Sequence, residues 1–292
     1  MYELRQISEH DYYIDGPTKI GIVQTGENEI VLIDSGYEQD ARNIILPLLN
    51  EKEWKLKAIL NTHCHADHIG GNRYLQQQTG CKVYAPGLDC PCTNSPVLDP
   101  MTFFGGLPFD GLQGKFPRAS GSECSLLTED ILPEGMEIIE LPGHSFDMVG
   151  FKTPDGNIFL ADSLSSPAVL EKYGIGFMWN AEKYLESLEK VKTLEGNLFI
   201  PAHAEVMEDV TVTADFNIRF TRQILKRILI LCICPKSFET ILHDLLDEYG
   251  MRMTVQKYGL IGCTVRSCLS SLHAQGKLEI ICSNGYLLWR TL

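Results

Sequence analysis

The sequence contains no hydrophobic run long enough to cross a bilayer. Its longest apolar stretches, such as ILILCIC at residues 228–234, are far shorter than the roughly 20 residues that a transmembrane helix needs. The N-terminal segment MYELRQISEHDYYIDG also lacks the basic start and apolar run of a secretory signal. We therefore expect a cytoplasmic protein that does not associate with membranes.

Basic residues are also scarce. The chain has 25 Lys and Arg against 38 Asp and Glu, which gives a net charge of −13. A general nucleic-acid-binding protein usually carries a basic face, so nucleic acid is a disfavoured partner unless basic residues gather in a local patch. The 292 residues, 44% of them hydrophobic, suffice for one large domain or for a large and a small one.

No CxxC pair occurs among the ten cysteines. This absence argues against a structural zinc knuckle and against a thioredoxin-like redox motif. In a chain of this length without a visible secretory signal, we expect the thiols to be reduced.

Strand-like and helix-like segments alternate over the first 230 residues. Apolar patterning predicts strands in IGIVQTG, EIVLIDSG, LKAILNT, KVYAP, MEIIELPGH, MVGFKTP, NIFLADS and NLFIPAHAE. Helices are predicted over residues 38–52, from Gly71 to a C-cap at Gly80, and over residues 181–193. This order predicts an α+β fold in which helices pack outside a pair of sheets.

Residues 87–123 differ from the rest, because they are rich in Pro, Gly and aromatic residues and show no clear period. A loop of that length inside a compact domain is usually functional, so we expect an insertion or lid over the site. Its aromatic residues would form an apolar wall for an acyl or aromatic group, or alternatively a dimer interface. The substrate-binding candidates are Phe103, Phe104, Phe109 and Phe116, with Tyr173, Phe177, Met178 and Trp179 on the opposite wall.

The composition changes near residue 230, which divides the chain into a predicted catalytic domain, 1–230, and a C-terminal domain, 231–292. A helix over about 212–231 is followed by two shorter helices and a hairpin turned at Asn284-Gly285. This is the order of a small winged-helix-like domain. Its basic residues, Lys257, Arg266, Lys277 and Arg290, are balanced by Asp244, Asp247, Glu248 and Glu279. We therefore favour a packing or dimerisation role, with a homodimer as a possible assembly, over nucleic-acid binding.

Metal-ligand residue types are concentrated in His63-Cys-His65-Ala-Asp67-His68. His63 and His65 directly follow a predicted strand, and alternate residues of an extended chain share one face, so both imidazoles can reach one ion. Asp67 and His68 lie past the bend and can reach a second ion. Further candidates stand at strand ends: His144, Asp162 and His203. Imidazoles and carboxylates suit zinc, and also iron or manganese.

THCHADHIGG resembles the T-H-x-H-x-D-H-x-G-G signature of the metallo-β-lactamase superfamily. The other motifs of that family follow in order: Asp34 in VLIDSG, His144 in LPGH, Asp162 in FLADS and His203 in IPAH. The resemblance covers about residues 10–210. It implies a four-layer αββα sandwich with the metal ions in a cleft at the sheet edges.

The resemblance also implies a ligand set. His63, His65 and His144 would hold one divalent metal ion. Asp67, His68 and His203 would hold the other, Asp162 would bridge them, and Asp34 would orient the histidine loop. Zinc is the default ion, with iron or manganese as alternatives. The implied reaction is hydrolysis by a metal-bridging hydroxide, with Asp67 as the catalytic residue that accepts or relays a proton.

Asp162 argues against a β-lactam antibiotic as the implied substrate, because many true β-lactamases of this fold have Cys or Ser at that position. A bridging Asp resembles the glyoxalase II, lactonase and ribonuclease branches. Flavodiiron proteins are disfavoured, because they typically have Glu where His65 stands. We rank hydrolysis of a small-molecule ester, thioester or lactone first, an endoribonuclease or phosphodiesterase second, and a ligand-sensing DNA-binding protein third.

Overall fold

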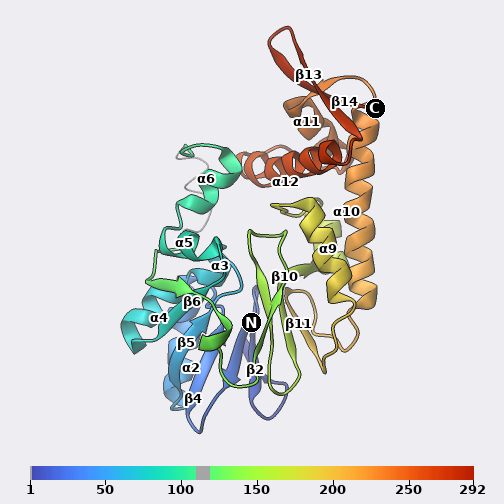
Figure 1. The fold of residues 1–292 in the computed structure, drawn as a ribbon. Coiled ribbons are helices and arrows are strands. Elements are labelled where there is room, and N and C mark those ends of the chain that lie inside the picture. Colours follow the sequence, from blue (N-terminus) through green and yellow to red (C-terminus); the bar gives the residue numbers. More distant parts are fainter. Residues whose placement is uncertain (1, 110–118) are drawn as a thin grey trace.

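The computed structural model describes residues 2–109 and 119–292, without the side chains of residues 172 and 173. Two β-sheets pack face to face, and helices cover their outer faces (Figure 1). The predicted α+β arrangement of helices outside a pair of sheets is therefore confirmed. Phe116 lies outside the described residues.

The first sheet contains seven strands in chain order. They are β1 (Glu3–Gln6), β2 (Asp11–Asp15), β3 (Ile20–Gln24), β4 (Glu29–Ile33), β5 (Lys55–Leu60), β6 (Lys82–Ala85) and β7 (Cys124–Leu126). Pairing is antiparallel from β1 to β4 and parallel from β4 to β7. The parallel strands therefore all end at one edge of the sheet.

The second sheet has the order β11-β10-β9-β8. These strands are β8 (Glu137–Glu140), β9 (Val149–Lys152), β10 (Ile158–Ser165) and β11 (Phe199–His203). A single turn of 3₁₀ helix, Glu129–Ile131, precedes β8. Only β10 and β11 pair in parallel, so their C-terminal ends also lie together.

Helices lie outside both sheets. Outside the first are α1 (Glu38–Asp40), a π-helical turn (Ala41–Ile45), α2 (Leu46–Glu51), α3 (Ala66–Ile69) and α4 (Asn72–Thr79). Outside the second are α8 (Pro167–Tyr173), α9 (Ala181–Val191) and α10 (Thr211–Leu231). The predicted C-cap at Gly80 is confirmed by its φ of 72°. Among the described residues, no helix is long and apolar enough to span a membrane.

The predicted loop 87–123 is not a structureless loop. It contains α5 (Asp89–Asn94) and α6 (Leu98–Phe104). Both helices are too short for a helical period to stand out from the sequence. Tertiary contacts stabilise α5 instead: the buried carboxylate of Asp89 accepts hydrogen bonds from the Cys64 amide at 3.0 Å and from the Asp147 amide at 2.9 Å.

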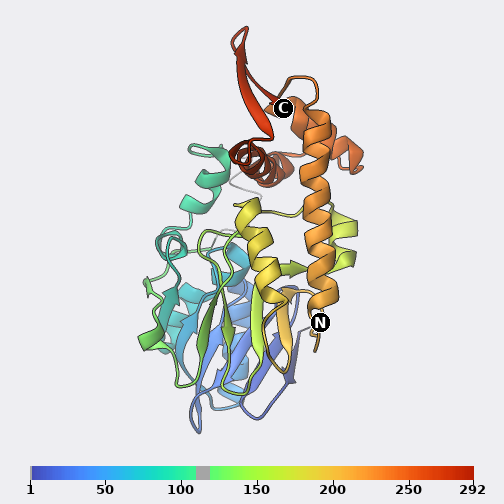
Figure 2. The ribbon, with the colours of Figure 1, turned by 45° about the vertical axis from the view of Figure 1, so that its right-hand side comes forward.

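The C-terminal segment contains the predicted helices and hairpin: β12 (Lys236–Ser237), α11 (Phe238–Glu248), α12 (Val255–Ala274), β13 (Leu278–Ser283) and β14 (Tyr286–Thr291). Asn284 and Gly285, with φ of 51° and 77°, form the predicted hairpin turn. The long helix α10 runs up the side of the molecule to this segment, and α12 lies between the sheets and the β13–β14 hairpin, beside α6 (Figures 1 and 2).

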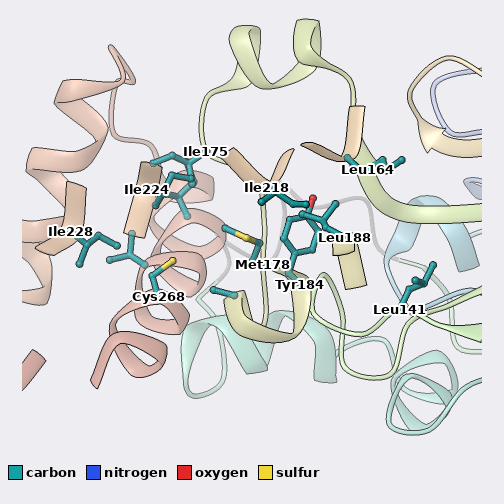
Figure 3. Packing of buried hydrophobic residues seen from close by; sticks show 14 of the residues in the cluster. Leu141, Leu164, Ile175, Met178, Tyr184, Leu188, Ile218, Ile224, Ile228 and Cys268 are labelled. Carbon is teal, nitrogen blue, oxygen red and sulfur yellow. The ribbon is translucent and has the colours of Figure 1, made fainter. Parts of the chain in front are cut away.

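Three hydrophobic clusters stabilise these layers. One lies between the sheets and a second lies under α2 and α4. The third extends from the outer face of the second sheet through α9 and α10 into the C-terminal segment, and Figure 3 shows part of it. Ile224 and Ile228 of α10 belong to the same cluster as Leu245, Val265 and Leu269. The expected boundary near residue 230 thus crosses a continuous core.

Because this core is shared, Leu245→Ala should destabilise the whole chain in a single cooperative transition. Deleting a fully buried leucine side chain costs about 2–5 kcal/mol, and Leu245 has no exposed surface. Chemical denaturation followed by tryptophan fluorescence and circular dichroism measures the effect. The matched control is Leu287→Ala in the same segment, where the leucine is 50% exposed and the expected change is within about 0.5 kcal/mol. A second, separate transition in the Leu245→Ala protein would contradict the shared core.

Candidate metal centre

Chemically active side chains converge where the parallel strands of both sheets end. Asp34 directly follows β4, and the segment from Thr62 to His68 follows β5. Asp162 lies in β10 and His203 ends β11. His144 comes from the connection between β8 and β9. Parallel pairing is thus what brings together residues that are up to 169 positions apart.

A bulge in β10 directs Asp162 into this cluster. The register with β11 shifts on both sides of Ala161, whose φ is 50°. A bulge inserts an extra residue and changes the direction in which the following side chain points. The Asp162 side chain consequently contacts histidines from three other segments: His68, His144 and His203.

Three imidazoles form the first group of donor atoms. His63 Nε2 lies 2.9 Å from His65 Nδ1, and His144 Nε2 lies 3.0 Å from the same atom. Asp162 Oδ2 lies 3.2 Å from His144 Nε2. One donor atom from each of these four residues lies within 4.8 Å of the others, which is the spacing of a shared metal ion.

The second group consists of Asp67, His68 and His203, again with donor atoms within 4.8 Å of one another. Asp67 Oδ2 lies 3.3 Å from His203 Nε2 and 3.6 Å from His68 Nε2. Asp162 connects the two groups, because its Oδ1 lies 3.2 Å from His68 Nε2 and its Oδ2 lies 3.4 Å from His203 Nε2.

Acceptors outside the cluster determine which imidazole nitrogen faces inward. His68 Nδ1 donates to Asp34 Oδ2 at 2.7 Å, and His203 Nδ1 donates to the Pro17 carbonyl at 2.9 Å. His144 Nδ1 lies 3.2 Å from the carbonyl oxygen of Phe177, which can only accept. Each Nε2 is therefore unprotonated in the neutral ring and available as a ligand.

Asp34 also holds the start of the histidine loop. Its carboxylate accepts from the Thr62 amide at 2.8 Å and from the Thr62 hydroxyl at 2.7 Å. The backbone of Asp34 is left-handed, with φ of 65°, a conformation that Asp tolerates better than most residues. The same side chain therefore connects the end of β4, the end of β5 and His68.

The second glycine of the HIGG sequence is required by close packing. A Cβ atom on Gly71 would lie 2.4 Å from the backbone oxygen of Ser35. Only glycine allows the two segments to come this close, and the Ser35 amide donates to the His68 carbonyl at 2.8 Å beside it.

Electrostatics separate the two groups. Burial lowers the pKa of His63, and burial with the neighbouring His144 lowers that of His65 to about 3. Asp162 raises the pKa of His203 to about 10, although burial opposes this shift. Burial also opposes protonation of His68, but three carboxylates raise its pKa. The rings of His63 and His65 are thus neutral, whereas His68 and His203 lie beside carboxylates that favour positive charge.

The donor set fits divalent metal ions. His68 Nε2 and Asp162 Oδ1 are completely buried, yet neither has a hydrogen-bond partner. Buried polar atoms without partners are costly, and here both face the other donor atoms. Neutral imidazoles with carboxylates match zinc, iron and manganese alike.

A cavity of about 220 Å³ opens beside the donor atoms. Its described lining includes the two predicted residues Phe103 and Phe177, together with His65, Asp67 and Asp162 of the cluster. Phe104, Phe109 and Trp179, also expected there, do not line it. Phe104 follows Phe103 on α6 and so faces another direction, where it contacts Phe109. Trp179 packs on Phe146 instead, and the side chain of Tyr173 is outside the described part of the chain.

Among the lining residues that were not anticipated are Tyr37, Asp99 and Leu260. Asp99 Oδ1 lies 3.8 Å from His65 Nε2. Burial, with the charges of Asp89 and Asp67, raises the pKa of Asp99 to about 7. Tyr37 stands three residues after Asp34, and this proximity to a candidate site residue could have placed it near the cavity from sequence alone. No sequence pattern indicates that Leu260 of α12 reaches a site about 200 residues away in the chain.

The model of the metallo-beta-lactamase superfamily matches residues 13–203, the part of the chain that supplies every residue of both donor groups. The chain belongs to this superfamily. Its members include hydrolases that bind divalent metals, and the α+β fold with a His/Asp cluster agrees with that membership.

Named relatives of this metallo-beta-lactamase superfamily protein include a hydroxyacylglutathione hydrolase of Cereibacter sphaeroides, 29% identical over 171 residues. That match covers 58% of this chain and 54% of the relative, so the chain spans about half the length of the curated relatives it matches first. A beta-lactamase-like protein 2 homolog of Drosophila melanogaster is 23% identical over 256 residues, covering 86% of this chain and 80% of the relative.

Two solved structures have the same fold over nearly the whole length of this chain. A metallo-beta-lactamase family protein from Thermus thermophilus superposes with a TM-score of 0.71 at 17% identity, covering 100% of this chain and 98% of that one. A beta-lactamase domain protein from Burkholderia ambifaria gives the same TM-score at 15% identity, with coverage of 99% and 94%. The C-terminal segment is therefore part of a fold that recurs.

Asp34→Asn should weaken zinc binding by this superfamily member about 10–100-fold, the usual cost of removing a group that orders a ligand. The asparagine side chain has only one oxygen, so it cannot accept from the Thr62 amide, the Thr62 hydroxyl and His68 Nδ1 as the Asp34 carboxylate does. Competition with a chromophoric chelator measures the affinity. Asp155→Asn is the matched control, because Asp155 accepts from the His10 amide at 2.9 Å far from the cluster. Equal zinc affinities for Asp34→Asn and the unaltered protein would refute the role given to Asp34.

Proposed function

We propose that this protein is a two-metal hydrolase that cleaves a small-molecule ester, thioester or lactone. The observation that carries the proposal is the convergence of seven side chains directly beside a largely apolar cavity. Two of their atoms, His68 Nε2 and Asp162 Oδ1, are buried without a hydrogen-bond partner. In this proposal His63, His65 and His144 would hold one ion, Asp67, His68 and His203 would hold the other, and Asp162 would be shared between them. Zinc is the ion we expect, with iron or manganese as alternatives.

Divalent ions in such a site supply a water-derived nucleophile at neutral pH and polarise the carbonyl group that it attacks. We assign the proton transfer to Asp67, which borders both the cavity and the donor atoms. Burial disfavours its charged form, but His68 and His203 hold the pKa of Asp67 below its usual range. Its carboxylate is therefore ionised, which is the form that the proposed role requires. The Thr18 hydroxyl, which donates to Asp67 Oδ2 at 2.9 Å, keeps it oriented.

The cavity favours an apolar acyl group. Phe103, Phe177 and Leu260 line it, together with Pro96 and Pro100. The ring centroids of Phe103 and Phe177 lie 6.0 Å apart, and that of Phe177 lies 5.2 Å from His65. An acyl group on these rings would hold its carbonyl carbon beside the donor cluster. Hydroxyacylglutathione hydrolases among the relatives act on an acyl compound, which supports the same class.

A phosphodiester substrate is less favoured. The described lining residues include three aspartates, Asp67, Asp99 and Asp162, and no Lys or Arg that would neutralise a phosphate backbone.

For the C-terminal segment we propose a winged-helix-like module that packs against the catalytic part. Its near balance of charge favours this role, or a homodimer contact, over nucleic-acid binding.

A substrate panel tests the proposal. Thioesters, lactones, aryl and alkyl esters, phosphodiesters and a short RNA are each incubated with the zinc-loaded protein. We expect turnover of the acyl compounds, loss of that turnover after chelation, and recovery with added zinc. RNA cleavage far faster than any ester would assign the site to the phosphodiesterase class instead.

Asp67→Asn is the informative variant for this panel. It should lower kcat on acyl substrates about 10²–10⁴-fold, the range for removing a proton-transfer group. Asp247→Asn on the exposed surface of α11 is the matched control and should leave kcat unchanged. Similar activity of both variants would show that Asp67 does not take part in the reaction.

A further inference from the structure

The carbonyl group of Phe177 is the acceptor that orients His144. It lies 3.2 Å from His144 Nδ1 and leaves Nε2 facing His65 and Asp162. Because a carbonyl only accepts, its position decides both the tautomer and the ring orientation of His144. The segment that carries Phe177 has no regular secondary structure, so something else must fix its backbone.

Thr264 of α12 holds the two peptide units on either side of Phe177. Its hydroxyl donates to the Gly176 carbonyl at 2.9 Å and accepts from the Met178 amide at 2.9 Å. The side chain is completely buried, and both contacts join residues more than 80 positions apart. The carbonyl of Leu260, at 3.4 Å, is the more distant acceptor for the same proton.

The same face of α12 borders the cavity. Leu260, one helical turn before Thr264, lines the cavity beside His65 and Phe177. One turn further along, Ser267 Oγ accepts from the Ala181 amide at 2.7 Å. Helix α12 thus contacts the Phe177 segment at several points, and only the Thr264 contacts flank Phe177 itself.

We infer that Thr264 is a positioning residue for the metal centre, whose hydroxyl fixes the Phe177 carbonyl and through it the Nε2 atom of His144. The C-terminal segment then contributes to metal binding, although it supplies no ligand. The inference rests on the metal-binding part of the proposed function and not on the substrate.

Thr264→Val tests the inference, because valine keeps the shape of threonine and replaces only the hydroxyl with a methyl group. Zinc is titrated into the metal-free protein against a chelator, and the ¹⁵N shifts of His144 are recorded without zinc. We expect Thr264→Val to weaken one of the two zinc sites about tenfold and to give a mixture of His144 tautomers. Thr264→Ser, which keeps the hydroxyl, should restore both properties.

Ser267→Ala is the matched control. It removes a hydroxyl of the same helix that accepts from Ala181 at the start of α9, but it does not touch the peptide units beside Phe177. It should lower the melting temperature without changing zinc affinity or the His144 tautomer. An unchanged tautomer in Thr264→Val, or equal loss of zinc affinity in Thr264→Val and Ser267→Ala, would overturn the inference. Failure of the unaltered protein to bind zinc would instead contradict the proposed function, and the tautomer would still decide the role of Thr264.

Discussion

The hydrogen bonds of the Asp34 carboxylate are the interaction on which the candidate centre depends most. They join the end of β4 to the Thr62 amide and hydroxyl after β5, and they fix the inward-facing nitrogen of His68. Together with the contact between the Cys64 amide and Asp89, this connection sets the direction in which the histidine loop leaves the sheet. The left-handed backbone of Asp34 and the close approach at Gly71 are local consequences of the same arrangement.

A similar principle applies to the other ligands. Each imidazole whose outer nitrogen contacts a fixed acceptor presents its second nitrogen to the cluster, as His203 does through Pro17 and His144 through Phe177. The acceptors come from a loop near the N-terminus and from the segment that α12 holds. The centre is thus ordered from several distant parts of the chain, including the C-terminal segment, which shares a hydrophobic core with the catalytic part.

Most of the strands and helices, and the candidate ligands, could be predicted from sequence because each leaves a local signal. Apolar period, cap residues such as Gly80 and the density of ligand types between His63 and His68 are all visible within a few positions. Helices α5 and α6 could not be predicted, since α5 is stabilised by tertiary hydrogen bonds to Asp89 and α6 packs against α12. The roles of Leu260 and Thr264 could not be predicted for the same reason: they depend on where α12 packs, and no local pattern encodes that contact.

Metal content measures the central claim most directly. The protein is purified without added metal and analysed by elemental mass spectrometry beside His65→Ala. The two donor groups predict about two divalent ions per chain, with a clear reduction in His65→Ala. Fewer than about one ion per chain, unchanged by that substitution, would contradict the two-metal centre.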